Sequence, residues 1–220
     1  MDIFDAMRTQ RSVRDFADRD VADDDLDRIL EAASWAPNAG NRQLWEFIVV
    51  RDAATKATLA EIYRESFDVL AKLISPDPPS PDARTHPKTM MKWSRALADT
   101  LETVPVLIVI GYDRSQSPFT AEGSIKAFAD ETVYTGVMPA VQNLMLAARA
   151  LGLGTCLTTA ANVLEGKTKQ ALGVPQHIQL VALLPLGYPA AEFNEVSRIP
   201  VGEKVHHDAW SSKRGLPEAS

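Results

Sequence analysis

The polar segment over residues 36–45 (Ala-Pro-Asn-Ala-Gly-Asn-Arg-Gln-Leu-Trp) constrains the fold more than any other part of the chain. Pro37 ends the helix predicted before it, because proline has no N–H to donate and restricts the preceding residue. The apolar run over residues 47–50 follows at once and predicts a strand. Gly40 lets the backbone approach a neighbouring group closely, and two asparagines and a glutamine bring amide donors and acceptors. Taken alone, the segment fits either an ordinary helix-to-strand turn or a ligand-binding loop.

Two helices, predicted over residues 2–10 and 22–35, precede the first strand, predicted over residues 45–50. The later elements alternate, with helices over 53–74, 88–100, 133–151 and 163–172 and strands over 104–112, 154–159 and 178–186. The predicted strands are short apolar runs, as in sheets covered on both faces, so we expect a layered arrangement of sheet and helices. Because the first strand comes so late, the chain does not begin as a doubly wound nucleotide-binding fold does.

Length and charge limit the function classes. The chain has 220 residues, and we expect residues 1–220 to form one domain. Its formal net charge of −6 argues against nucleic acid as a partner, because non-specific binding needs a basic face that displaces counterions. A local group of arginines can still hold a phosphate on an acidic protein.

The lengths of the apolar runs and the number of cysteines indicate where in the cell the protein is expected. No run approaches the roughly 20 apolar residues that span a bilayer, and the acidic first residues differ from the basic start of a signal peptide. Cys156 is the only cysteine, so no intrachain disulfide can form, and its apolar neighbours predict a buried, inert thiol. We therefore expect a cytoplasmic protein without a membrane partner.

The histidines do not predict a metal site. His206 and His207 are adjacent, so their side chains do not converge, and no second ligand pair has suitable spacing. We expect no bound metal.

Five short motifs occur in one order along the chain. They are Gln-Arg-Ser-Val-Arg-Asp-Phe at 10–16, the segment at 36–50, Leu-Gly-Leu-Gly-Thr-Cys at 151–156, Leu-Gly-Tyr-Pro at 186–189 and Arg-Ile-Pro at 198–200. In this order they resemble the FMN-dependent nitroreductase family, from about residue 2 to about residue 210. The resemblance implies an α+β fold with a mixed central sheet flanked by helices, in an intertwined homodimer. Residues 190–220 would then be a C-terminal extension packed on the partner, and residues 75–87 a Pro-rich surface loop.

Arginines near the N-terminus are candidate anion ligands. From the residues alone, they fit either solvated side chains or a phosphate site. The resemblance implies that Arg11 and Ser12 hold the FMN phosphate and ribityl chain, and that Arg198 closes the phosphate site. It places Arg14 against the N1–C2=O edge of the flavin, where a fixed cation stabilises the charge of the reduced ring. The family often has a second arginine where this chain has Gln10, which carries no charge.

The resemblance assigns two further groups of site residues. The loop residues Pro37, Asn38, Ala39 and Asn41 would come from the partner subunit and lie along the flavin, while Gln43 and Trp45 brace the loop and pack in the interface. Leu157, Thr158 and Thr159 would lie beside the ring, with the backbone N–H of Thr159 against flavin N5. Read without the family, residues 157–159 fit a buried strand end equally well.

These expectations lead to a function. The resemblance implies an FMN-dependent homodimer that transfers hydride from NAD(P)H through flavin N5 to a small electron acceptor such as a nitroaromatic or quinone. Residues 113–128, with Phe119 and Phe128, are the candidate cover of the substrate side. Three alternatives stay open: another reaction on the same FMN fold (dehalogenation, ene reduction, flavin fragmentation), a flavin-binding redox protein with little turnover, and a cofactor-free module whose arginines bind an acidic partner.

Overall fold

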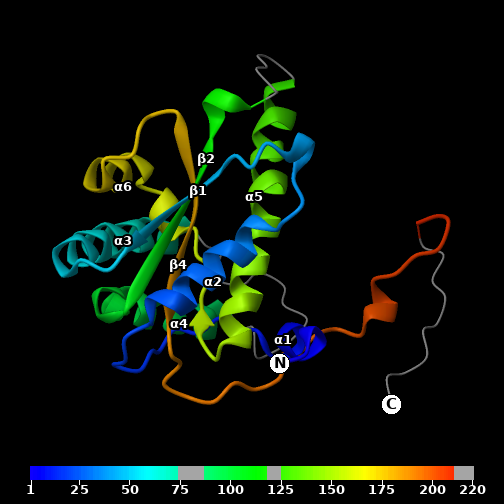
Figure 1. Ribbon diagram of the computed structural model, residues 1–220, viewed down its shortest axis with the longest axis horizontal. Helices are drawn as coiled ribbons and strands as arrows, with labels where there is room; N and C mark the ends of the chain where they lie inside the picture. Colours follow the sequence, from blue (N-terminus) through cyan, green and yellow to red (C-terminus); the bar gives the residue numbers. More distant parts are fainter. Residues whose placement is uncertain (74–86, 118–124, 211–220) are drawn as a thin grey trace.

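The computed structural model describes residues 1–73, 87–117 and 125–210 (Figure 1). In this part of the chain, the strands form a four-stranded sheet in the order β1-β2-β4-β3. The strands are β1 (Trp45–Val50), β2 (Val106–Asp113), β3 (Gly154–Thr155) and β4 (Ile178–Gly187). All three ladders between them are antiparallel, and an isolated bridge between Ser12 and Thr155 adds a parallel contact.

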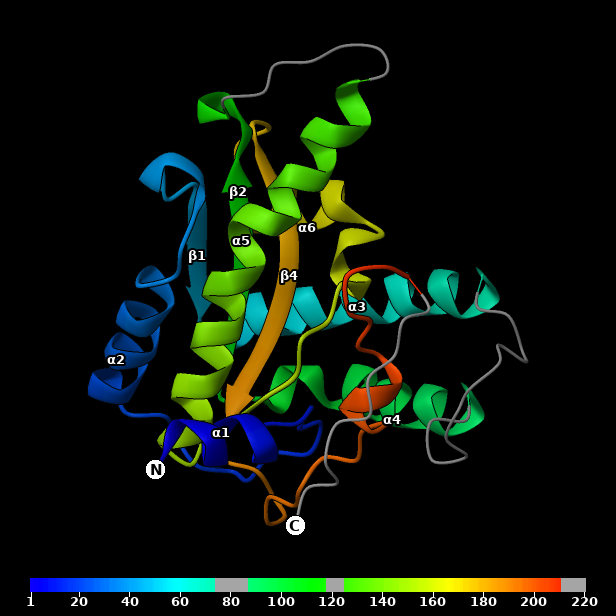
Figure 2. The same cartoon turned by 90° about the vertical axis from the view of Figure 1, so that its right-hand side faces the viewer.

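Helices cover both faces of the sheet (Figures 1 and 2). The helices are α1 (Ile3–Thr9), α2 (Asp23–Ser34), α3 (Ala53–Leu73), α4 (Pro87–Thr100), α5 (Ile125–Ala150) and α6 (Glu165–Leu172). Helices α2 and α5 lie on one face, and α3, α4 and α6 lie on the other. The short helix α1 lies against α5, and the Asp2 side chain caps it by accepting from the N–H of Phe4 at 2.8 Å.

The central strand β2 explains why the sheet needs two helical layers. Its side chains alternate, so Ile108 and Ile110 enter the core under α2 and α5, while Leu107 and Val109 enter the core under α3 and α4. Every residue of β2 is buried. A strand that is apolar on both sides is stable only where both faces are covered, as the continuous apolar run predicts.

Two predicted elements have wrong boundaries. Helix α5 begins at Ile125, eight residues before the predicted start, and the apolar residues Ile125, Phe128 and Ala129 have the helical spacing that the prediction overlooked. Strand β3 ends at Thr155 rather than Thr159, since the chain beyond it makes one isolated bridge, Thr158 with Leu183, and then turns.

Some predictions fall outside the described residues. These are the Pro-rich loop up to residue 86, Phe119 in the candidate cover, and residues 211–220 of the C-terminal extension. The described end of the chain leaves the body beyond α1 (Figure 1), and Trp210 there is 85% exposed and stacks on His206 with ring centroids 4.4 Å apart. Among the described helices, none has the length and apolar character needed to cross a membrane.

Candidate functional site

A cleft of about 420 Å³, the arginine cleft, lies where three segments meet. The chain after α1 forms one wall, helix α4 the second, and the chain after β4 the third. The lining residues are Arg11, Ser12, Val13, Arg14, Asp15, Trp93, Ala96, Thr100, Pro189, Ala191, Glu192, Phe193 and Asn194. The structure thus gathers three of the predicted site residues, Arg11, Ser12 and Arg14, at one cleft.

Backbone pairing fixes the wall that carries these three residues. The N–H of Val13 donates to the carbonyl of Thr155 at 2.9 Å, and further along the N–H of Ala17 donates to the carbonyl of Tyr188 at 2.8 Å. Close packing requires glycine at position 154, because an added Cβ would come 2.6 Å from Cγ2 of Val13. The Leu-Gly-Leu-Gly motif therefore has a structural role in the approach of this segment to β3.

The arginines of the cleft are not committed to protein carboxylates. Across the described residues, neither Arg11 nor Arg14 forms an ion pair, whereas nearby Arg8 pairs with Asp5 and with Glu195. Two acidic residues also line the cleft, so its charge is mixed. Cations without a partner beside an open cleft are the arrangement that binds an anionic ligand.

A buried layer of polar groups lies beneath the cleft. Cys156 is 2% exposed, which confirms its predicted burial, and burial raises the pKa of its thiol although Arg14 and Ser12 act in the opposite direction. The hydroxyls of Tyr63 and Thr158 are hydrogen-bonded at 2.8 Å. Burial also raises the pKa of Tyr63, so this phenol stays protonated at neutral pH. Sequence reasoning missed Tyr63, because it fits the apolar spacing of α3.

The segment after β3 presents a backbone donor. Thr158 and Leu183 exchange two backbone hydrogen bonds, at 3.1 and 2.9 Å, and the N–H of Ala160 donates to the Thr158 hydroxyl at 3.3 Å. Between these fixed residues, the N–H of Thr159 has no partner in the part of the chain that the structure describes. Thr159 is exposed and Leu157 is 38% exposed, so this segment is not a buried strand end.

The loop after α2 has an unusual backbone. Gly40, Asn41 and Gln43 have φ angles of 62°, 51° and 52°, a region that residues other than glycine seldom occupy. The N–H of Gln43 donates to Oδ1 of Asn38 at 2.8 Å, and its side-chain amide contacts Asn41, so Gln43 braces the loop as predicted. Trp45 is buried in the core of its own chain, and the predicted interface contact of both residues stays a prediction. Left-handed residues held by side chains are frequent at ligand-binding sites.

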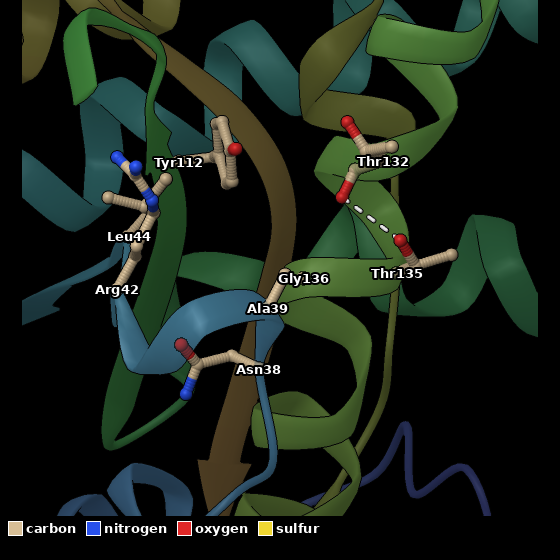
Figure 3. A pocket seen from close by; sticks show the side chains of 8 residues that line it. All are labelled: Asn38, Ala39, Arg42, Leu44, Tyr112, Thr132, Thr135 and Gly136. Carbon is tan, nitrogen blue, oxygen red and sulfur yellow. Dashed lines mark hydrogen bonds between the residues drawn. The ribbon is translucent and has the colours of Figure 1, made fainter. Parts of the chain in front are cut away.

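A second cavity of about 210 Å³, the loop pocket, lies between this loop and α5 (Figure 3). Its lining residues are Asn38, Ala39, Arg42, Leu44, Tyr112, Thr132, Thr135 and Gly136. Within one chain, two of the predicted loop residues, Asn38 and Ala39, therefore line a different cavity from Arg11 and Arg14, and Pro37 and Asn41 line neither. Arg198 is exposed, donates to the carbonyl of Ser197 at 2.8 Å, and is not among the lining residues of either cavity.

Several lining residues were not predicted. Trp93 and Thr100 bring helix α4 to the arginine cleft, and Trp93 is 54% exposed. The sequence signal that could have identified Trp93 is the position of a large aromatic residue on the polar side of its helix. Arg42 and Tyr112 carried no signal, because one follows a turn and the other ends an apolar strand. Within the described ranges, no three His, Cys, Asp or Glu side chains gather as metal ligands do.

Comparison with known proteins places this architecture among enzymes of one family. The family model described as "Nitroreductase family" matches residues 7–188. A 5,6-dimethylbenzimidazole synthase of Rhodospirillum rubrum is 29% identical over 209 residues, which is 94% of this chain and 88% of that protein. An NADH dehydrogenase of Thermus thermophilus is 29% identical over 214 residues, or 89% of this chain and 91% of that protein.

A solved structure shares the fold. It is oxidized iodotyrosine deiodinase bound to FMN and 3-iodo-L-tyrosine, with a TM-score of 0.72 and 22% sequence identity. The match covers 95% of this chain and 100% of that chain. At this identity, the similarity shows a common arrangement of helices and sheet.

Proposed function

Because the chain belongs to the nitroreductase family, we propose that it is an FMN-dependent oxidoreductase that uses NAD(P)H to reduce a small electron acceptor. The names of its relatives cover several reactions, including a synthase and an NADH dehydrogenase. Family membership therefore supports an oxidoreductase, and the nicotinamide donor and the acceptor are parts of the proposal.

The residues of the arginine cleft fit FMN. This cofactor combines a phosphate with a planar ring, and the cleft of about 420 Å³ offers two guanidinium groups that pair with no described carboxylate and the aromatic side chains of Trp93 and Phe193. Arg11 and Ser12 would bind the phosphate and ribityl chain, and Arg198 would reach the same phosphate from the C-terminal segment. When bound, FMN supplies the hydride chemistry, accepting from the nicotinamide and delivering to the acceptor.

The chain's own residues contribute charge and position. Arg14 carries a positive charge in a half-buried position close enough to influence the ionisation of Cys156 and Tyr63. A cation held in place before the reaction stabilises negative charge that develops beside it. The N–H of Thr159, which has no partner among the described residues, would donate to flavin N5, and Leu157 and Thr158 would lie beside the ring.

Two copies of the chain would complete each site. In one chain, Pro37, Asn38, Ala39 and Asn41 belong to a loop that does not line the arginine cleft. Large apolar side chains are exposed on α1 and at the end of α2, with Phe4 at 74% and Trp35 at 71%. Exposed apolar groups of this kind mark a protein interface. We infer a homodimer in which the loop of one copy lies along the cofactor of the other, with the C-terminal extension packed on the partner.

The single observation that carries the proposal is the presence at this cleft of Arg11 and Arg14, which form no ion pair with any residue that the structure describes. The test is to purify the protein and identify any bound yellow chromophore as FMN after release. NADH or NADPH should bleach it without oxygen, and a nitroaromatic or menadione should restore the colour. A colourless protein that refuses added FMN would contradict the proposal, and so would a flavin that only dithionite bleaches.

Arginine variants separate the two proposed roles. Arg14→Ala should slow flavin reduction by a larger factor than it weakens FMN binding, because its charge acts on the ring. Arg11→Ala should do the reverse, because its charge acts on the phosphate. Equal effects of Arg14→Ala on both quantities would remove the electronic role from Arg14.

A further inference from the structure

We propose that the loop pocket binds the anionic group of a small planar acceptor, such as an aromatic carboxylate, with Arg42 as the cation and Tyr112 as a hydrogen-bond donor. Reduction of the bound acceptor rests on the proposed function, but binding of the acceptor in this pocket does not. The pocket lies between the loop and the first half of α5 (Figure 3).

Tyr112 shows that the pocket can bind a polar ligand. The residue is 4% exposed, yet its phenol group makes no hydrogen bond to any residue that the structure describes. Among the described residues, the buried side-chain atoms without a partner are Ser66 Oγ and His207 Nε2, so the phenol oxygen of Tyr112 is not sealed in the core and stays open to the pocket. Opposite the ring is Gly136 of α5, where an added Cβ would lie 3.5 Å from Cε2 of Tyr112. The missing side chain leaves the pocket wide enough for a ligand to reach the phenol.

Arg42 provides the charge. One of its N–H groups donates to the carbonyl of Gln116 at 3.0 Å, which holds the guanidinium at the pocket. No described carboxylate pairs with Arg42, and the nearby Asp113 already accepts from Ser115 and Gln116. Because a guanidinium has five donors, most of its hydrogen-bonding capacity remains available to a ligand carboxylate.

The size and walls of the pocket limit the ligand. A volume of about 210 Å³ is below the roughly 300–1,000 Å³ of drug-sized sites, so one substituted ring or a conjugated chain of similar size fits. Leu44 and Ala39 give the pocket apolar walls. On the α5 side, the Thr135 hydroxyl already donates to the carbonyl of Thr132 at 3.1 Å. The strong polar contacts therefore concentrate at Arg42 and Tyr112.

The pocket shares Asn38 and Ala39 with the loop that, under the proposed function, lies along the cofactor of the second copy. A ligand held by its carboxylate at Arg42 would therefore sit beside the same loop as the cofactor. Arg42 would therefore make the acceptor side of the site selective for acceptors that carry a negative charge.

The test uses the FMN-loaded enzyme with 4-nitrobenzoate and its neutral analogue 4-nitrobenzamide. Each two-electron turnover oxidises one NADH and, with one further proton, converts the nitro group to nitroso and releases water. We expect the wild-type protein to favour the carboxylate in kcat/KM, and Arg42→Gln to lower the ratio of carboxylate to amide about tenfold. Arg28→Gln is the matched control, because Arg28 is an exposed arginine of α2 that faces Asp25 at 3.6 Å. It should leave the ratio unchanged.

Binding without turnover separates this inference from the proposed function. Calorimetry should show 4-nitrobenzoate binding that weakens about tenfold in Arg42→Gln and less in Tyr112→Phe, which loses a donor but no charge. If both acceptors are reduced and the ratio is the same in wild type and Arg42→Gln, the inference is wrong while the proposed function stands. If Arg42-dependent binding occurs without any reduction, the site stands and the proposed function is wrong. Circular dichroism confirms that each variant is folded.

Discussion

The two faces of the sheet are closed to different degrees. On the face covered by α3 and α4, Leu97, Leu101 and Leu107 are at most 1% exposed, and the helices of the same chain complete the core. On the other face, the core under α2 and α5 is equally buried, but a shallow hollow between α1, α2 and α5 contains exposed Ile3 and Trp35. The core under α3 and α4 is complete in a single chain, and the apolar side chains exposed around α1 and α2 are where we propose that a second copy packs.

This difference also divides the candidate site. Helix α4 of the closed face lines the arginine cleft, whereas the loop that contains Asn38 joins α2 to the sheet on the open side. Arg11 and Arg14 thus lie against the core that is complete in a single chain. The amide loop lies where we infer the second copy, and experiments that weaken one face at a time can test this division.

The largest effect is expected in the closed core. Leu97→Ala should lower the free energy of unfolding by about 2–5 kcal/mol, because it removes a side chain that is 1% exposed and leaves a cavity. Denaturant titration at two protein concentrations measures this loss. It should be the same at both, since the closed face needs no partner; a concentration-dependent loss would show that this core also depends on assembly.

The next effect concerns the open face. Trp35→Glu puts a charge on the proposed interface and should weaken dimerisation at least about 100-fold, or roughly 3 kcal/mol. Sedimentation at a series of protein concentrations measures the change, and FMN content should fall with it.

The control for this variant lies on the opposite face. Leu73→Glu changes a residue at the end of α3 that is 76% exposed, and should alter neither assembly nor FMN content. If Trp35→Glu behaves like Leu73→Glu, with an effect within about 0.5 kcal/mol, the open face is ordinary surface.

A smaller effect is expected under the arginine cleft. Tyr63→Phe removes the hydrogen bond to Thr158 and should cost about 1–2 kcal/mol of stability. Because Thr158 precedes the donor residue Thr159, the variant should also slow flavin reduction by NADH, which stopped-flow absorbance measures. A variant that loses stability but keeps the wild-type reduction rate would limit Tyr63 to a structural role.

Much of this fold could be predicted from residue patterns, and the reasons differ between elements. The strand at residues 45–50 has the predicted bounds, because Pro37 and the polar loop end the helix before it. Strand β2 could be predicted because its apolar run is continuous. The start of α5 could have been predicted, because Ile125, Phe128 and Ala129 continue the helical spacing, but the prediction begins only at Val133. Strand β3 is shorter because pairing with β4, which local sequence does not encode, ends at Thr155.

The site shows the same limit. Arg11, Ser12 and Arg14 are close in sequence, so their common cleft could be predicted. The loop pocket could not, because it joins Arg42 to Tyr112 and to α5 through packing between distant segments. The hydrogen bond between the hydroxyls of Thr158 and Tyr63, which are 95 positions apart, could not be predicted for the same reason.

The smallest effect is expected at Asp113, which supports the open side. Its carboxylate accepts from the backbone and hydroxyl of Ser115 and from the side chain of Gln116, whose carbonyl holds Arg42. These hydrogen bonds lower the pKa of Asp113. Asp113→Ala should therefore cost about 1 kcal/mol at neutral pH, the typical loss for a cap of this kind.

The pH dependence of that loss follows from the direction of the pKa shift. A carboxylate whose folded pKa is lowered contributes its full stability above its unfolded pKa of about 3.9, and loses it as the pH falls through the folded value. The difference between wild type and Asp113→Ala should be constant above about pH 5 and shrink below pH 4. Denaturant titrations from pH 3 to pH 7 measure it, and a difference that grew on acidification would show that Asp113 is protonated when it bonds Ser115. Since Asp113 fixes the segment that holds Arg42, the same variant should also reduce the preference of the loop pocket for 4-nitrobenzoate, by a smaller factor than Arg42→Gln.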